Sequence, residues 1–221
     1  NSELEFNIET TSSDNYLKSH KIKSDITNNN SLLNSFLSIK GNNKDLYVEA
    51  KVEAYEDLTK ENSSDKYQYL FPSFELSKSF NNNLNLESNG YYKNYDTNVF
   101  EKVLINDLRY SSIPKINTNG FISKFNLLFK NVTTESDKSN EYSNNFRSQN
   151  FGSLLYDISY PLKKEGNNFD SFISGKASLM YSPNKNKNIK SLDRKISIKN
   201  IFNQNRLGLS DSVEGGQSLT L

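Results

Sequence analysis

The sequence predicts an all-β fold, in which antiparallel strands form a segment of a transmembrane β-barrel. Apolar and polar residues alternate along much of the chain, whereas the 3.6-residue period of amphipathic helices is nearly absent. Many expected strands approach the roughly 9–11 residues that a transmembrane β-strand needs. The connections are either tight turns or long polar loops. We therefore expect about ten or eleven strands of a larger barrel, with residues 1–221 as part of one domain.

The clearest expected strand is Asp45–Tyr55, with the sequence DLYVEAKVEAY. Successive side chains of a strand point to opposite faces, so this segment has one dry face and one wet face. The dry face consists of Leu46, Val48, Ala50, Val52 and Ala54, and the wet face consists of Tyr47, Glu49, Lys51, Glu53 and Tyr55.

Other strands are expected along most of the chain. Alternation predicts strands at Phe121–Asn131, Ser153–Pro161 and Ser171–Ser182. Two segments with aromatic ends, Tyr67–Ser77 and Asn98–Ser111, are also expected to form strands. Weaker patterns predict strands at Leu4–Glu9, Tyr16–Ile26, Leu32–Lys40 and Leu84–Lys93, and a last strand that begins at Gln217. Pro72 makes Tyr67–Ser77 an atypical ladder strand, because proline has no backbone N–H to donate.

The connections differ in length. Gly41–Lys44 and Phe80–Asn83 are tight, whereas Val132–Asn150 and Pro183–Gly216 are long and polar. When the strands are counted in order, the two long loops fall at the same end of the sheet. Outer-membrane barrels combine short periplasmic turns with longer external loops. The segment 183–216 is therefore predicted to be a long external loop.

The composition argues against several classes of function. The net charge is +1, so no global electrostatic attraction favours nucleic acid as a partner. Cysteine is absent and His20 is the single histidine, which disfavours thiolate or histidine metal sites and a catalytic triad. The carboxylates form no recognisable acid/base constellation. We therefore expect no enzymatic activity, no metal and no cofactor.

The C-terminal end of the long loop carries a dense polar motif. Arg206 can form a bidentate pair with Asp211 or Glu214, and its glycines permit tight turns. We expect this loop to fold inward over a lumen. The motif consists of Asn205, Arg206, Gly208, Asp211, Glu214, Gly215 and Gly216. The basic stretch before it, Lys185–Lys195, is either a solvated loop face or a contact for phosphorylated groups such as lipid head groups.

Several segments resemble, in order, the barrel of the LptD family of lipopolysaccharide-assembly outer-membrane proteins, also called the organic solvent tolerance family. The similarity is greatest to α-proteobacterial members. It rests on SSDNYLKSHKI, LLNSFLSIKG, YEDLTKENSSDKYQYLFPSFELS, LINDLRYSS and, most specifically, NIFNQNRLGLSDSVEGGQSLTL. The last segment departs from the family where Ser210-Asp211-Ser212 replaces a bulkier Asp-Arg-like pair, and the chain ends before the next family glycine.

The resemblance implies that the chain is a middle segment of the C-terminal barrel of an outer-membrane lipopolysaccharide translocon in a Gram-negative bacterium. Such a protein is not an enzyme. The implied partners are lipopolysaccharide, membrane lipid, a periplasmic lipopolysaccharide-bridge protein and an LptE-like lipoprotein inside the barrel, without nucleic acid. The side chains expected to face the lumen are Glu49, Lys51, Glu53, Lys124, Lys130 and Lys176.

The pattern leaves other interpretations open. A small, complete outer-membrane barrel of the porin or adhesin type would show the same alternation. A soluble antiparallel β-sandwich or solenoid, such as a glycan-binding module, would also alternate apolar and polar residues. An outer-membrane hydrolase ranks below these, because it would need a catalytic set that includes histidine.

Overall fold

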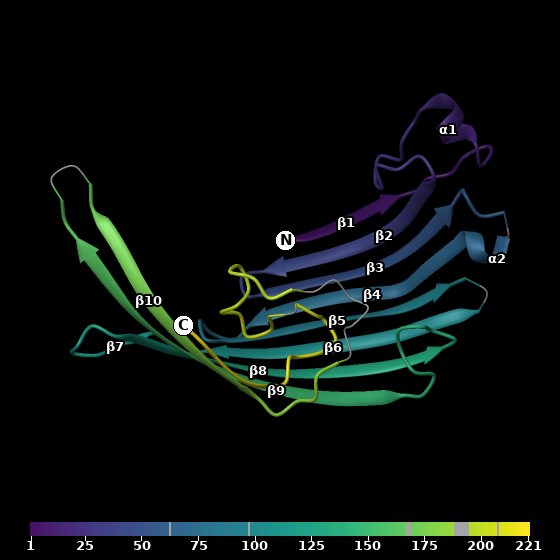
Figure 1. Cartoon of the computed structure of the whole chain (residues 1–221). Helices are drawn as coiled ribbons and strands as arrows, with labels where there is room; N and C mark the ends of the chain where they lie inside the picture. Colours follow the sequence, from purple (N-terminus) through teal and green to yellow (C-terminus); the bar gives the residue numbers. More distant parts are fainter. Residues whose placement is uncertain (62, 97, 167–168, 188–194, 207) are drawn as a thin grey trace. The chain divides into compact units, whose positions relative to one another are not determined.

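The computed structural model describes residues 1–61, 63–96, 98–166, 169–187, 195–206 and 208–221. It confirms an all-β antiparallel fold, and these residues form eleven strands and two short helices (Figure 1). The strands follow one another in the order β1-β2-β3-β4-β5-β6-β8-β9-β10-β11, and β7 pairs with β8. In the part of the chain that the structure describes, β1 and β11 end this order and do not pair with each other.

The chain divides into two compact units. Unit 1 comprises Asn1–Ser79, Glu87–Asn106 and Val132–Ser148. Unit 2 comprises Phe80–Leu86, Asp107–Asn131 and Gln149–Leu221. Four strands therefore contribute residues to both units: β5 (Leu84–Tyr95), β6 (Val99–Ser111), β8 (Ile122–Asp137) and β9 (Arg147–Lys164).

Unit 1 begins with an antiparallel series of four strands. These are β1 (Ser2–Asn7), β2 (Leu32–Asn43), β3 (Leu46–Asp57) and β4 (Tyr67–Ser79). The register of β3 on β4 shifts between Lys51 and Glu53, opposite a segment that contains Pro72. A β-bulge leaves residues of one strand unpaired, which accommodates the missing N–H of proline. Pro72 is thus tolerated inside a long strand, and it follows a cis peptide bond.

The first long connection contains a helix that the sequence did not predict. A strand was expected at Tyr16–Ile26, but α1 occupies Tyr16–His20 and ends at Lys21, whose φ is +55°. The burial of Leu17, together with Leu33 and Leu58, explains the difference: a small apolar cluster holds one helical turn. A second helix, α2 (Ser63–Lys66), lies in the connection between β3 and β4.

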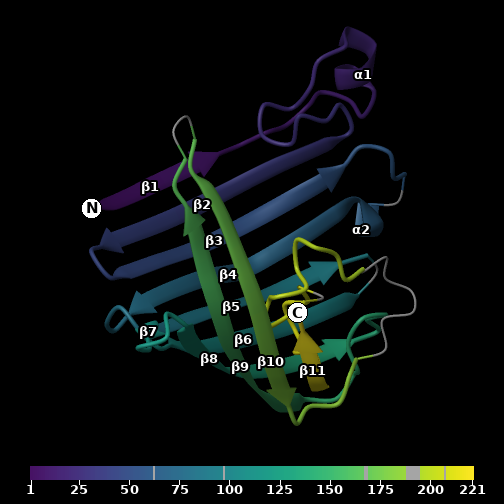
Figure 2. The same cartoon turned by 60° about the vertical axis from the view of Figure 1, so that its left-hand side comes forward.

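Unit 2 contains a long hairpin formed by β9 (Arg147–Lys164) and β10 (Ser171–Ser182). The short strand β11 (Gly216–Thr220) pairs with the end of β10, and both strands are visible in Figure 2. The two-residue strand β7 (Lys115–Ile116) pairs with the start of β8.

The prediction of a long loop at Val132–Asn150 is mostly wrong. The strand β8 continues to Asp137 and β9 begins at Arg147, so only 138–146 connects them. Threonine suits strands because its β-branched side chain packs well on a pleated surface, and the alternation continues through Thr133 and Thr134. The other long connection, 183–215, separates β10 from β11 as expected.

The two faces of the strands differ in composition and in exposure. The predominantly apolar face is exposed in both units. Its exposed members include Leu37, Ile39, Val48, Val52, Tyr69 and Phe74 in unit 1, and Leu108, Phe125, Leu127, Phe129, Leu154 and Leu179 in unit 2. The opposite face, here called the polar face, buries polar and charged side chains. These include Asn34, Ser38, Glu53, Glu101 and Thr134 in unit 1, and Asp107, Lys130, Ser153, Ser178 and Ser182 in unit 2. The same face also buries apolar side chains, among them Val103, Ile105 and Val132 in unit 1 and Leu128, Leu155 and Met180 in unit 2.

Gly90→Ala is expected to destabilise unit 1 by about 1–3 kcal/mol, the usual cost of overpacking. A Cβ at Gly90 would lie 2.8 Å from the ring of Phe74 and 2.8 Å from the carbonyl oxygen of Val103. Gly41→Ala in β2 is the control, because nothing lies within 4 Å of its added Cβ. Urea unfolding of the refolded chain measures both, and equal midpoints for the two variants would contradict the expected clash.

Candidate functional site

The polar face of unit 1 brings three of the predicted lumen residues together on β3. The ammonium of Lys51 lies 2.6 Å from the carboxylate of Glu53, which also accepts a hydrogen bond from the Tyr55 hydroxyl. Glu49 accepts hydrogen bonds from Ser38 and from the Tyr47 hydroxyl. Glu49, Lys51 and Glu53 line a hollow of about 380 Å³. The strands β4 and β5 contribute Glu75 and Asn89 to it, together with apolar walls from Leu70 and Phe74.

The polar face of unit 2 carries the other three predicted residues. Lys124 is half-buried, whereas Lys130 is only 3% exposed. Lys176 lies 3.5 Å from the carboxylate of Asp157 and 4.7 Å from the centre of the Phe202 ring, a distance that permits a cation–π contact. All six residues thus lie opposite the exposed apolar face, while their position in a lumen stays a prediction.

A buried ion pair connects this face to the C-terminal loop. The ammonium of Lys130 lies 2.6 Å from Asp107 Oδ1 and donates a hydrogen bond of 2.7 Å to the carbonyl oxygen of Ser210. Asp107 is only 5% exposed, and its second oxygen pairs with Arg109 at 2.8 Å. No local feature of the sequence indicated this arrangement, because Ser210 lies 80 residues after Lys130 in the chain.

The loop motif is held by its own side chains. Arg206 forms a bidentate pair with Glu214, which decides between the two partners that the sequence allowed. Asp211 pairs instead with Lys187. Asn205 donates hydrogen bonds to the carbonyl oxygens of Leu209 and Ser212, which closes the turn around Gly208.

The glycines of the motif are needed for different structural reasons. Gly208 and Gly216 have φ values of +62° and +105°, which residues with a Cβ rarely adopt. Gly215 must be a glycine because an added Cβ would lie 2.0 Å from the carbonyl oxygen of Asn184. Its backbone N–H donates to the side chain of Asn186. The basic stretch Lys185–Lys195 lies largely outside the described residues, which omit 188–194.

Gln204 joins the loop to the strands by hydrogen bonds, a role that the sequence did not suggest. Its side-chain amide donates to the carbonyl oxygens of Asn126 in β8 and Ser153 in β9, at 3.2 and 2.7 Å. Val213 of the same loop is 1% exposed. The loop is therefore a docked element of unit 2, joined to its strands by polar contacts from Gln204 and Ser210.

The Arg206–Glu214 pair is expected to hold the loop in this conformation. Its hydrogen bonds with Glu214 raise the pKa of the guanidinium, although partial burial opposes them, so Arg206 stays charged at all working pH values. Glu214→Gln removes one charge with little change of shape. It should destabilise the docked loop by about 1.5–3 kcal/mol, the usual contribution of hydrogen bonds to charged groups.

Hydrogen exchange of the loop amides measures this effect. Faster exchange is expected between Asn205 and Glu214 in Glu214→Gln. Glu165→Gln is the control, because Glu165 pairs with Lys163 at an exposed strand end, where such pairs contribute at most about 1 kcal/mol. Unchanged loop exchange in Glu214→Gln would show that the pair does not hold the loop.

The described residues place limits on the chemistry of the site. Within them, no three or more His, Asp or Glu side chains gather where they could hold a metal ion. None of the helices in the described ranges is long and apolar enough to span a membrane. Comparison with known proteins finds no family model that matches the chain and no curated relative.

Proposed function

We propose that this chain forms part of an outer-membrane β-barrel that delivers lipopolysaccharide to the outer leaflet of a Gram-negative bacterium. The observation that carries the membrane part of the proposal is the exposure of the apolar face along most of the strands. Water-soluble proteins rarely leave large contiguous apolar surfaces uncovered. Here whole rows of large apolar side chains are exposed, while Asp107 and Lys130 are buried on the opposite face.

A bilayer gives this arrangement a physical reason. Lipid tails solvate the exposed apolar side chains, and strands in lipid must satisfy their backbone groups by pairing into a closed barrel. The principal strands contain 12–18 residues, which exceeds the roughly 9–11 residues needed to span the hydrocarbon core. The polar face would then line the lumen, where Lys51, Lys124 and Lys176 are able to meet sugar-phosphate head groups.

The assignment to lipopolysaccharide rests on the resemblance to the LptD family. A periplasmic lipopolysaccharide-bridge protein would supply the substrate, and an LptE-like lipoprotein would occupy the lumen. The docked loop segments 195–206 and 208–215, with their Arg206–Glu214 pair, support this proposal as an external loop that folds over the polar face. Its contact with Lys130 would restrict the lumen on that side.

Single-cysteine labelling tests the membrane part, because the chain has no native cysteine. Lys124→Cys and Phe125→Cys place thiols on opposite faces of β8. In lipid vesicles, a membrane-impermeant maleimide should modify the thiol in Lys124→Cys much faster than the one in Phe125→Cys. Fast modification of both thiols, with folding in buffer without detergent, would support the soluble β-sandwich instead.

Photo-crosslinking in the native cell envelope tests the lipopolysaccharide part. A photoreactive residue at Lys51 or Lys124 should capture lipopolysaccharide, whereas one at Val48 should capture membrane lipid without dependence on active lipopolysaccharide transport. An inserted barrel that captures no lipopolysaccharide from either polar position would reject the assembly role and favour a porin or adhesin.

A further inference from the structure

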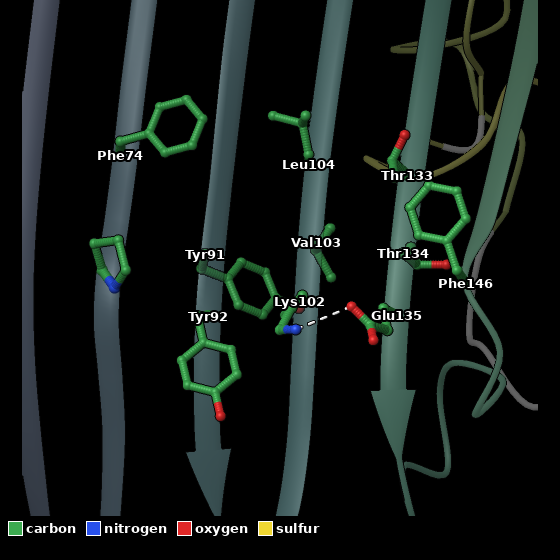
Figure 3. A pocket seen from close by; sticks show the side chains of 11 residues that line it. Phe74, Tyr91, Tyr92, Lys102, Val103, Leu104, Thr133, Thr134, Glu135 and Phe146 are labelled. Carbon is green, nitrogen blue, oxygen red and sulfur yellow. Dashed lines mark hydrogen bonds and ion pairs between the residues drawn. The ribbon is translucent and has the colours of Figure 1, made fainter.

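The exposed apolar face of unit 1 contains a hollow of about 300 Å³. Figure 3 shows that its side chains come from β4, β5, β6 and β8, with Phe146 from the connection after β8. The principal apolar lining consists of Pro72, Phe74, Tyr92, Leu104 and Phe146. The volume lies at the lower end of the roughly 300–1,000 Å³ typical of ligand pockets.

Gly90 of β5 determines where the ring of Phe74, one wall of the hollow, can lie. The ring of Phe74 leans over this glycine, because its Cε1 atom lies 2.8 Å from the position that a Cβ would take. The ring therefore occupies the space that a side chain at Gly90 would need, and it forms one wall of the hollow together with Leu104. This depression is lined almost entirely by carbon.

Two opposite charges lie at one end of the hollow. The ammonium of Lys102 is 3.0 Å from the carboxylate of Glu135, as the dashed line in Figure 3 marks. These side chains are 51% and 41% exposed. The same ammonium lies 5.5 Å from the centre of the Phe100 ring and 5.8 Å from that of Tyr92, so aromatic rings help to hold it in place.

We propose that this hollow binds an acyl chain of a zwitterionic phospholipid. The chain enters the apolar hollow, the lipid phosphate contacts Lys102, and the head-group ammonium contacts Glu135. Paired opposite charges complement a zwitterion, whereas a purely anionic head group would meet the Glu135 carboxylate unfavourably. The proposal goes beyond lipopolysaccharide assembly and does not depend on it, since it requires only that this face meets lipid.

Tryptophan fluorescence tests the site, because the chain contains no tryptophan. Phe146→Trp places one fluorophore at the edge of the hollow, on a residue that is already exposed. The protein in dodecyl maltoside micelles is titrated with phosphatidylethanolamine that carries brominated acyl chains. Saturable quenching is expected for Phe146→Trp, and only linear quenching for Leu37→Trp, which lies on the same apolar face in β2. Identical curves for the two positions would overturn the proposal.

Head-group recognition is tested by a second substitution in the Phe146→Trp protein. Lys102→Met should weaken the saturable phase by about two- to fivefold, as expected for an exposed charge contact. Lys115→Met, at an exposed lysine of β7, should leave it unchanged. Brominated phosphatidylglycerol should bind more weakly than phosphatidylethanolamine, and equal or tighter binding would overturn the zwitterion assignment.

The two proposals fail separately. Saturable quenching in micelles together with fast labelling of both β8 thiols would reject the membrane barrel and keep this lipid site. Slow maleimide modification of Phe125→Cys without saturable quenching would support the membrane barrel and reject the lipid site. Far-UV circular dichroism of each variant verifies that the strands are intact.

Discussion

Asp107→Ala is expected to destabilise the protein by about 3–5 kcal/mol, the largest effect of any single substitution considered. The substitution leaves the ammonium of Lys130 buried, with the carbonyl oxygen of Ser210 as its remaining described hydrogen-bond acceptor. An uncompensated buried charge is costly because it has lost its hydration without gaining an opposite charge. Urea unfolding of the chain refolded in detergent gives the free energy of unfolding for this comparison.

Two control variants separate charge from packing. Asp107→Leu combined with Lys130→Met removes both buried charges and should recover most of the loss, as replacement of buried ion pairs by apolar residues often does. Arg109→Met removes the more exposed partner of Asp107 and should cost less than about 1 kcal/mol. If the double variant is no more stable than Asp107→Ala, the cost comes from altered packing and the electrostatic explanation fails.

Val48→Arg is expected to destabilise the protein by about 2–4 kcal/mol in lipid, because Val48 would face the middle of the bilayer. Its side chain is 37% exposed, so the same substitution on a protein surrounded by water should change stability by at most about 0.5 kcal/mol. The measurement is urea unfolding from phospholipid vesicles. A small effect in vesicles would contradict the outward position of this face in a membrane.

The matched control for Val48→Arg adds the same charge on the opposite face. Asn89→Arg is suitable because Asn89 is exposed and lines the same hollow as Glu49 and Glu75. It should have little effect, since those carboxylates compensate the added charge. Lys51 is a less suitable control, because its removal would also take the cation from the buried carboxylate of Glu53.

Much of the fold could be predicted because strand alternation is a local property. The faces of Asp45–Tyr55 and Ser171–Ser182 follow from period two alone, and the structure places their side chains accordingly. The errors occurred where tertiary contacts outweigh local pattern. Leu17 buries against Leu33 and Leu58, which favours a helical turn in the polar segment Tyr16–Ile26. In Val132–Asn150, strand pairing extended through residues whose polarity indicated a loop.

The candidate site was only partly predictable for the same reason. Arg206 and Glu214 are eight residues apart, so local spacing indicated that they could pair. No local signal linked Lys130 to Asp107 or to Ser210, because these contacts depend on strand pairing and on the path of a distant loop. Gln204 was missed because it binds backbone carbonyl oxygens, which every residue carries.

The sequence by itself determined the all-β class, most strand positions and the division of each strand into an apolar and a polar face. These features depend on residue spacing within one strand, where each side chain alternates in direction. Only the tertiary structure decided that the apolar faces are exposed and that Asp107 and Lys130 are buried together. Burial depends on which distant segments cover a face, and chain folding over 80 residues brings Ser210 to Lys130.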